Sequence, residues 1–327
     1  MFAERVAASG HGIALSRSKR YSIVYLLAEQ EYPPMMVVTA PTGHIGSHVL
    51  SDLLQHDEAV RVIVRDPNRL PAEVRDRVEV VAGSHRDRDV VDRAFEGADS
   101  VFWLVPADRT VQSVYDAYVS FSIPAADAIV RHGVSRVVAV SALGRGQQRY
   151  AGHVSASLAM EDLLRSTGVH LRALTMPSFM DNMLYQVQSI KNDGVIRGTI
   201  PGDLKAPLVD TRDIAAVASR LLLDHTWTGQ DSLGVLGPED LSLNDMAAIL
   251  TDVLGTPIRF EEGSREQAKQ GFVSFGYSDA MAQSMIDMDI AKEHGLDNGL
   301  ELTPENTTPI SFRQWAEEVL KPALDAR

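Results

Sequence analysis

Short apolar runs alternate with stretches in which apolar residues recur every three or four positions, beginning at Met36. The apolar runs predict strands at 36–39, 61–65, 78–82, 100–105, 136–141 and 169–174. The helical spacing predicts helices at 44–56, 87–95, 110–132 and 155–166. We expect Pro124 to kink the third helix, Gly133 to end it and Gly168 to end the fourth.

The predicted strands are continuous apolar runs rather than alternating ones. Strands of this kind are buried on both faces, which is typical of a parallel sheet covered by helices. The pattern therefore predicts the α/β class, with a doubly wound parallel sheet of the Rossmann type. Such a sheet binds its ligands beyond the carboxyl ends of its strands.

The strict alternation weakens after Pro177. A short strand at 207–210, helices at 211–224 and from 242 to about 255, and a strand at 258–260 are followed by mostly helical sequence. We therefore expect a Rossmann domain at 35–177 and a smaller C-terminal α/β lobe at 178–327, interleaved with the main sheet. Residues 1–34 are expected to be an extension outside the fold, since no small-residue cleavage site supports a targeting peptide.

The junction between the first strand and the first helix has the pattern of a phosphate-binding loop. Gly43 allows the backbone to approach a pyrophosphate, and the free amides of the helix start attract it. Gly46 permits close packing of helix on strand, whereas Ala40 replaces the usual first glycine and fits the turn if its φ is negative. The candidate cofactor-binding residues here are Ala40, Thr42, Gly43, His44, Ile45 and Gly46.

The end of the second predicted strand bears on which dinucleotide is bound. Arg65 and Arg69 could both reach a ribose 2′-phosphate, while Asp66 could hold the free 2′-hydroxyl of NAD instead. The two arginines favour NADP(H) over NAD(H). Further candidates for cofactor binding follow the other strands, at Ser84, Val105, Pro106 and Ser141.

The composition of the 327-residue chain excludes several classes of function. The absence of cysteine excludes disulfides, thiolate metal sites and a cysteine nucleophile, and it fits a cytoplasmic protein. A net charge of −13 argues against nucleic acid as the main partner, and no apolar run is long enough for a membrane span. His44 and His48 have a metal-like spacing but no evident carboxylate partner, so we expect no metal.

Seven segments together resemble the NmrA-like family of atypical short-chain dehydrogenase/reductase proteins. The resemblance covers about residues 36–325 and rests on 42–46, 64–67, 96–102, 140–144, 176–182, 209–215 and 236–239. It implies an NADP(H)-preferring Rossmann domain with a small C-terminal lobe that forms a substrate cleft. Members resemble either NADPH-dependent reductases of quinones and small carbonyls, or cofactor-binding regulators that sense redox state.

The usual proton relay of the wider superfamily, a Ser with Tyr-x-x-x-Lys, is incomplete. Ser141 ends the fifth predicted strand and Tyr150 follows it, but residue 154 is valine and the helix at 155–166 has no lysine. The family resemblance places a lysine at Ser157 and an arginine at Met176. The catalytic candidates that remain are Ser141, Tyr150 and His153, a histidine expected in a loop.

Two functions stay open at this point. The first is an NADPH-dependent oxidoreductase that reduces a quinone or small conjugated carbonyl by hydride transfer, for which water can supply protons. The alternative is a non-catalytic NADP(H)-binding regulator that acts through a protein partner. We expect a small-molecule substrate and no nucleic-acid or membrane partner, and the sequence leaves a homodimer open.

Overall fold

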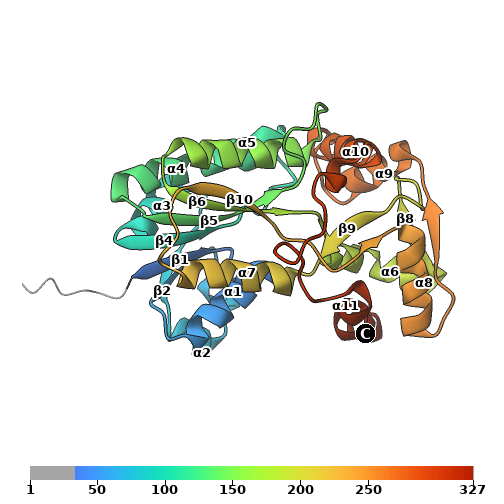
Figure 1. Cartoon of the computed structure of the whole chain (residues 1–327), viewed down its shortest axis with the longest axis horizontal. Coiled ribbons are helices and arrows are strands. Elements are labelled where there is room, and N and C mark those ends of the chain that lie inside the picture. The colour runs from blue at the N-terminus through green and yellow to red at the C-terminus, as the bar shows by residue number, and fades with distance from the viewer. Residues whose placement is uncertain (1–33, 327) are drawn as a thin grey trace, which may run out of the picture. The chain divides into compact units, whose positions relative to one another are not determined.

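A seven-stranded parallel sheet forms the centre of the computed structural model, which describes residues 34–326 (Figure 1). Across the sheet the strands are β10 (Gln230–Gly234), β6 (His170–Met176), β5 (Arg136–Ala142), β4 (Ala98–Trp103), β1 (Met35–Thr39), β2 (Val60–Val64) and β3 (Glu79–Ala82). Every neighbouring pair runs parallel. The predicted α/β class with a doubly wound parallel sheet is confirmed.

The strand order reverses between β1 and β4. The chain runs outward from β1 to β2 and β3, and then returns to the other side of β1 to form β4, β5 and β6. In doubly wound sheets, this reversal separates the loops at the carboxyl ends and opens a crevice there. The candidate site is therefore expected beyond Thr39 and Trp103, the last residues of β1 and β4.

Helices cover both faces of the sheet (Figure 1). One face packs against α1 (His44–Gln55), α2 (Ala72–Arg75) and α7 (Thr211–Leu223). The other face packs against α3 (Arg88–Phe95), α4 (Phe121–His132) and α5 (His153–Ser166). Val37 and Val38 of β1 belong to opposite clusters and both are fully buried, which is why the central strands read as continuous apolar runs.

The helix predicted at 110–132 starts later than expected. Helical structure begins at Val114 and passes through a π turn, η2 (Asp116–Ser120), into α4. The Asp108 carboxylate accepts hydrogen bonds from both the amide and the hydroxyl of Thr110, and such a local turn competes with a helix. Pro124, which lacks an amide hydrogen, is the fourth residue of α4, in the turn that follows the π turn. The segment 104–113 is therefore a loop at the carboxyl edge of the sheet.

Strand β10 was not predicted, because four of its five residues are polar or glycine. It lies at the edge of the sheet and pairs only with β6, from Gln230 opposite Leu171 to Gly234 opposite Thr175. An edge strand needs no apolar run, since one side is not paired with another strand. Through β10, the sequence beyond residue 177 contributes to the main sheet.

Residues 178–326 (the C-terminal lobe) also form two small sheets and several helices, in one compact unit with the residues of the main sheet. Its strands are β7 (Ser178–Phe179), β8 (Val195–Gly198), β9 (Ala206–Val209), β11 (Asp240–Leu241) and β12 (Arg259–Glu262). Its helices are α6 (Val187–Asp193), α8 (Leu243–Leu254), α9 (Arg265–Ser274), α10 (Asp279–Glu293), α11 (Phe312–Trp315) and α12 (Lys321–Asp325), with shorter turns η3 (Met180–Gln186), η4 (Leu296–Asn298) and η5 (Ala316–Leu320). Leu250, Trp315 and Leu320 are fully buried in its core.

A capping box at Ser242 and Asp245 starts α8, where the sequence predicts a helix to begin. The Asp245 amide donates to Ser242 Oγ, and the Ser242 amide donates to the Asp245 carboxylate, each at 3.1 Å. The helix ends at Gly255, whose φ of +68° lies in the left-handed region that glycine favours. Local signals therefore predicted both ends of this helix.

The predicted N-terminal extension, residues 1–34, lies outside the described residues apart from Pro34. Between residues 34 and 326, none of the helices combines the length and apolar character that crossing a membrane requires.

Candidate functional site

The loop between β1 and α1 is a tight turn held by its own backbone. The Gly43 amide donates to the Ala40 carbonyl at 3.0 Å, and the Ser47 amide donates to the Gly43 carbonyl. Ala40 has a φ of +50°, so the negative φ that would let alanine fit this turn easily is not met. Alanine adopts here the left-handed conformation that the usual glycine adopts without strain.

Gly43 and Gly46 differ in what surrounds them. A Cβ on Gly43 would meet only the Ala40 carbonyl oxygen, at an ordinary 3.4 Å. A Cβ on Gly46 would lie 2.2 Å from the same oxygen, closer than two atoms can approach. Gly46 is therefore required by the packing of α1 on the loop. At Gly43 the protein leaves the space open, as a cradle for a phosphate group does.

The start of α1 offers hydrogen-bond donors without a capping side chain. Its N-cap residue is Gly43, which has no side chain to accept a hydrogen bond from the helix amides, and the first turn holds no acidic residue. Five other helices, α7 to α11, are capped by Asp210, Ser242, Ser264, Ser278 and Ser311. Uncapped amides and the positive end of the helix dipole suit an anion. The residues present therefore fit the pyrophosphate of a dinucleotide.

Arginines gather at one side of this loop. Arg65 and Arg69 follow β2, are both exposed, and form no ion pair within residues 34–326. A hollow of about 390 Å³ brings Arg69 together with the loop, and its lining includes Pro41, Thr42, Ser47, Arg69 and Arg77. Asp66, the alternative ligand for NAD, instead caps the short turn η1 (Pro67–Arg69) through the Asn68 amide at 3.0 Å. Arg69 and Arg77 therefore contribute positive charge beside the loop, whereas the Asp66 carboxylate is engaged within η1.

A buried polar cluster joins the carboxyl ends of β1, β3 and β4. Thr39 Oγ1 donates to the Phe102 carbonyl and accepts from the Leu104 amide, each at 2.9 Å. His85 Nε2 lies 3.0 Å from the Leu104 carbonyl, and its ring packs edge-on against Trp103 and Phe121. Burial lowers the pKa of His85 to about 4, against the hydrogen bond to Leu104, and the charge of Arg65 lowers it further. His85 therefore stays neutral and fixes the edge.

The candidates after β3 and β4 lie on either side of this cluster. Ser84 is half-buried, and its hydroxyl accepts from the Arg86 amide at 3.2 Å. Val105 packs partly into the core, whereas Pro106 is exposed. Sequence reasoning missed His85, although a histidine directly after the expected loop residue Ser84 was a signal that could have found it.

Ser141 reaches a buried carboxylate. Its hydroxyl donates to Glu161 Oε2 at 2.6 Å, and Arg165 and Arg145 reach Glu161 Oε1 at 2.8 and 2.9 Å. Burial raises the pKa of the Glu161 carboxyl. The hydrogen bonds from Ser141 and Arg165 and the charges of Arg145 and Arg165 outweigh burial, so the net pKa is lowered. The hydroxyl hydrogen of Ser141 is therefore donated to Glu161 on α5.

Tyr150 and His153 have surroundings of their own and make no contact with Ser141 among the hydrogen bonds of residues 34–326. Tyr150 is 48% exposed, and partial burial with nearby Tyr115 and Asp287 raises its pKa. The expectation that His153 lies in a loop is wrong, because it is the first residue of α5. Its Nδ1 lies 3.3 Å from the Tyr118 hydroxyl, and burial lowers its pKa. Among the described residues, no hydrogen bond joins these three candidates.

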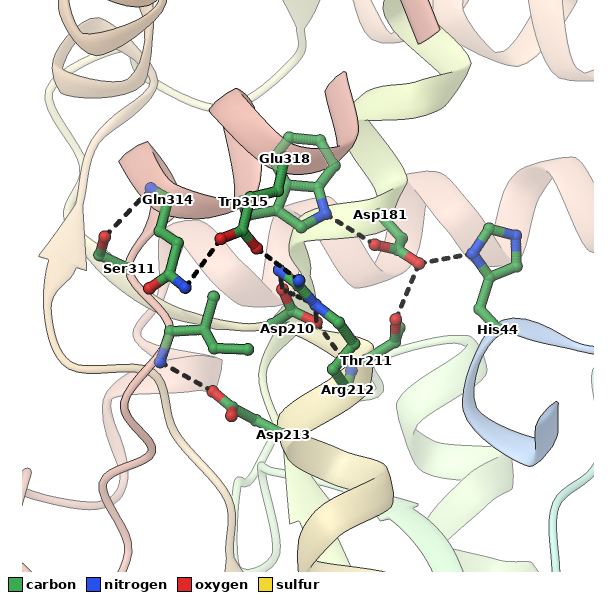
Figure 2. A network of polar contacts seen from close by, with 11 residues as sticks. His44, Asp181, Asp210, Thr211, Arg212, Asp213, Ser311, Gln314, Trp315 and Glu318 are labelled. Atoms are coloured by element: carbon green, nitrogen blue, oxygen red, sulfur yellow. Dashed lines mark hydrogen bonds and ion pairs between the residues drawn. The ribbon is translucent and has the colours of Figure 1, made fainter. Parts of the chain in front are cut away.

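The phosphate loop is linked to the C-terminal lobe by a polar network, shown in Figure 2. His44 Nδ1 lies 2.6 Å from Asp181 Oδ2, and Thr211 and Trp315 donate to the same carboxylate. The inference that His44 lacks a carboxylate partner is therefore wrong, because the partner is 137 residues away in sequence. No group of three or more acidic or histidine residues suited to a metal occurs among the residues described.

Comparisons with known proteins find reductases that this chain resembles. A (4-alkanoyl-5-oxo-2,5-dihydrofuran-3-yl)methyl phosphate reductase of Streptomyces griseus is 32% identical over 292 residues, which span 87% of this chain and 97% of that protein. An NAD(P)H azoreductase of Xenophilus azovorans is 28% identical over 260 residues, 78% of this chain and 86% of that one.

Solved structures show the same fold. An NADPH-dependent quinone oxidoreductase of Escherichia coli, complexed with NADPH, matches with a TM-score of 0.72 at 19% identity, over 88% of this chain and 100% of that chain. The model of the NmrA-like family matches residues 34–317, as the seven sequence segments predicted. The chain therefore belongs to the NmrA-like family.

Proposed function

We propose that the protein is an NADPH-dependent oxidoreductase that reduces a quinone or a small conjugated carbonyl by hydride transfer. The observation that carries the proposal is the open, uncapped turn at Gly43, together with the exposed Arg65 and Arg69 after β2, which form no ion pair within residues 34–326. The relatives support the reaction class, since two of them are named as a reductase and an NAD(P)H azoreductase.

The residues that would hold the cofactor are those of the loop and the neighbouring strand ends. The amides of His44 and Ile45 would bind the pyrophosphate, and Arg65 and Arg69 would bind a 2′-phosphate. Ser84, Val105 and Pro106 would border the rest of the molecule at the carboxyl edge. When bound, the reduced nicotinamide supplies a hydride.

The substrate class follows from what the site lacks. The Ser141 hydroxyl donates its hydrogen bond to Glu161, and α5 contains no lysine that could complete a tyrosine–lysine proton relay. An acceptor whose reduced form is a weak base needs the least acid catalysis, and quinones have this property. The name of the Streptomyces relative describes an alkanoyl dihydrofuranone, a conjugated carbonyl, as its substrate.

The test is oxidation of NADPH by the purified protein with a panel of quinones, conjugated enones and azo dyes. We expect turnover with at least one acceptor, faster with NADPH than with NADH. Gly43→Val provides the matched control, because it should remove cofactor binding and turnover together. Turnover no faster than that of the Gly43→Val protein for every acceptor would reject the enzyme.

A regulator without turnover is the second candidate, favoured by the lack of any hydrogen bond among Ser141, Tyr150 and His153 within the described residues. It would bind NADP(H) through the same loop and act through a protein partner whose binding depends on redox state. Measurable cofactor affinity without turnover, together with partner binding that differs between NADP⁺ and NADPH, would support it.

A further inference from the structure

The contact between His44 and Asp181 has the form of a histidine held by a carboxylate. His44 Nδ1 lies 2.6 Å from Asp181 Oδ2, which is short for a hydrogen bond of this type. The Asp181 side chain is only 13% exposed, whereas that of His44 is 66% exposed. One partner is therefore buried and the other faces solvent.

Asp181 is fixed in place by two further donors. Thr211 Oγ1 donates to Oδ2 at 2.9 Å, and Trp315 Nε1 donates to Oδ1 at 2.8 Å. Asp181, Thr211 and Trp315 belong to η3, α7 and α11, respectively, and Trp315 is fully buried. A carboxylate held from three directions cannot turn away from the histidine without breaking other hydrogen bonds.

This geometry assigns the hydrogens of the imidazole ring. An ionised carboxylate only accepts hydrogen bonds, so Nδ1 carries a hydrogen and donates it to Asp181. Figure 2 shows the other ring nitrogen, Nε2, pointing away from the network. His44 therefore presents Nε2 outward while Asp181 fixes its orientation and tautomer.

The location of the pair matters as much as its geometry. His44 is the first residue of α1, directly after Gly43, and its ring reaches Asp181 in the C-terminal lobe. The exposed ring thus stands between the loop that would seat the cofactor and the lobe that would form the substrate cleft. Ser141 and His153 do not have this freedom, since the first bonds to Glu161 and the second packs against Tyr118.

We propose that His44 is the proton donor of the reductase reaction proposed above, and that Asp181 is its positioning residue. A hydride added to the substrate would move the carbonyl or conjugated π electron pair onto the substrate oxygen, and the reduced nicotinamide would be the source of that hydride. The Nε2–H bond of the imidazolium breaks and an O–H bond forms. Neutral His44 then regains its proton from water. The Asp181 carboxylate stabilises the charged ring, as carboxylates do in other histidine pairs.

The proposal predicts a dependence on the acceptor. Reduction of a conjugated enone leaves a strongly basic enolate, which needs a proton in the transition state, whereas reduction of a quinone leaves a weakly basic phenolate. General acid catalysis contributes more as the developing anion becomes more basic. Loss of His44 should therefore slow enone reduction much more than quinone reduction.

The first experiment compares His44→Gln with His48→Gln, an exposed histidine one turn further along α1. Glutamine keeps a donor for Asp181 but cannot release a proton. We expect kcat with an enone to fall ~100-fold in His44→Gln, kcat with a quinone to fall less than ~10-fold, and the Kd for NADPH to change less than ~3-fold. His48→Gln should match the unsubstituted protein in all three measurements.

The second experiment reads the pair without turnover. In ¹⁵N-histidine spectra of the protein without substrate, we expect the neutral ring of His44 to be the Nδ1–H tautomer, and the imidazolium that donates the proton to carry a hydrogen on both nitrogens. Asp181→Asn should shift the ring toward a mixture of tautomers and lower kcat with the enone, again with little change in NADPH affinity. Trp315→Phe, which removes one donor to Asp181, should give an intermediate result.

Several outcomes would overturn the proposal. Equal losses with enone and quinone would indicate a structural role for His44, and a large loss of NADPH affinity would indicate a role in cofactor binding. An Nε2–H tautomer in the unsubstituted protein would contradict the assigned hydrogens. Absence of turnover with every acceptor would reject the proposed function and the proton donor together, whereas turnover that is unchanged in His44→Gln would reject the proton donor alone.

Discussion

Gly43 and Gly46 lie three residues apart in one loop, and the structure gives each a different reason to be glycine. The backbone of Gly43 has a φ of −89°, which any residue adopts, and its missing side chain leaves room that the protein does not use. Gly46 is in contact with the Ala40 carbonyl, so its missing side chain is needed by the fold itself. Substitutions can therefore separate binding from stability.

Gly43→Val should remove cofactor binding without unfolding the protein. Gly46→Ala should instead lower the stability of the fold. We expect Gly43→Val to lower NADPH affinity more than ~100-fold and to change the free energy of unfolding by about 1 kcal/mol or less. Gly46→Ala should cost about 2–3 kcal/mol, because its Cβ must displace the loop backbone. Urea unfolding and cofactor titration of both variants check this, and a strongly destabilised Gly43→Val would contradict it.

Ala40→Gly should stabilise the protein. The positive φ of Ala40 costs an L-residue about 1–2 kcal/mol, and glycine relieves that strain but loses more entropy on folding. We expect a net gain of about 0.5–1 kcal/mol in the free energy of unfolding, seen as a higher urea midpoint with an unchanged slope. A lower midpoint would show that the turn holds alanine without strain.

At this scale the sequence predicted positions better than conformations. The loop, its glycines and the strand ends lie where the pattern placed them. The sign of φ at Ala40 was not predictable, because alanine is compatible with a negative φ and only the closure of the turn onto Gly43 forces the other sign. The orientation of Ser141 toward Glu161 depends on a contact between β5 and α5, which no local pattern records.

Among the elements, the ends of β1, β3 and β4 are joined by a cluster whose only titratable member is buried. His85 bonds to Leu104, and Leu104 in turn bonds to Thr39. Because the ring is buried and neutral, folding and protonation of His85 oppose each other. The cluster therefore makes the stability of this edge depend on pH.

Stability should fall as the pH is lowered through the window of His85. The pKa is about 4 in the folded protein and near the ordinary 6.5 after unfolding, so between these values only the unfolded chain takes up the proton. We expect a loss of about 3 kcal/mol from pH 6.5 to pH 4 that is absent in His85→Gln, which keeps a donor for Leu104. Urea unfolding at a series of pH values measures it, and parallel curves for the two proteins would contradict the assignment.

The elements themselves were predictable where apolar periodicity or capping marked them, as in β1, α1, α7 and α8. Strand β10 was missed because its polar residues reflect a place at the edge of the sheet, which is set by pairing with β6. The start of the helix before Pro124 was placed too early, because Asp108 and Thr110 form a local turn instead of helix. The loop that contains this turn extends to Ser113. In each case a tertiary contact or a local turn overrode the apolar pattern.

In the whole molecule, segments distant in sequence meet at one edge of the sheet. Asp181 and His44 illustrate why this part was not predictable: their separation of 137 residues leaves no local pattern, and only the return of η3 to the phosphate loop brings them together. The hollow beside the loop after β1 likewise combines residues of that loop with Arg69 and Arg77, which follow β2. A ligand that binds such a site stabilises the folded chain as a whole, because the unfolded chain lacks the site.

Thermal unfolding with cofactor should therefore report both binding and its specificity, without any acceptor. At a concentration of NADPH 100 times its Kd, binding contributes about 2.7 kcal/mol, which we expect to raise Tm by roughly 5 °C. Arg65→Ala should remove most of this shift, since a charge-assisted hydrogen bond to a 2′-phosphate contributes about 1.5–3 kcal/mol. The shift produced by NADH, which has no 2′-phosphate, should be the same with and without Arg65.

The control for the change in charge is Arg93→Ala, which replaces an exposed arginine on α3. Equal losses of the NADPH and NADH shifts in Arg65→Ala would show that Arg65 does not recognise the 2′-phosphate, and no shift with either nucleotide would leave the loop at Gly43 without its ligand.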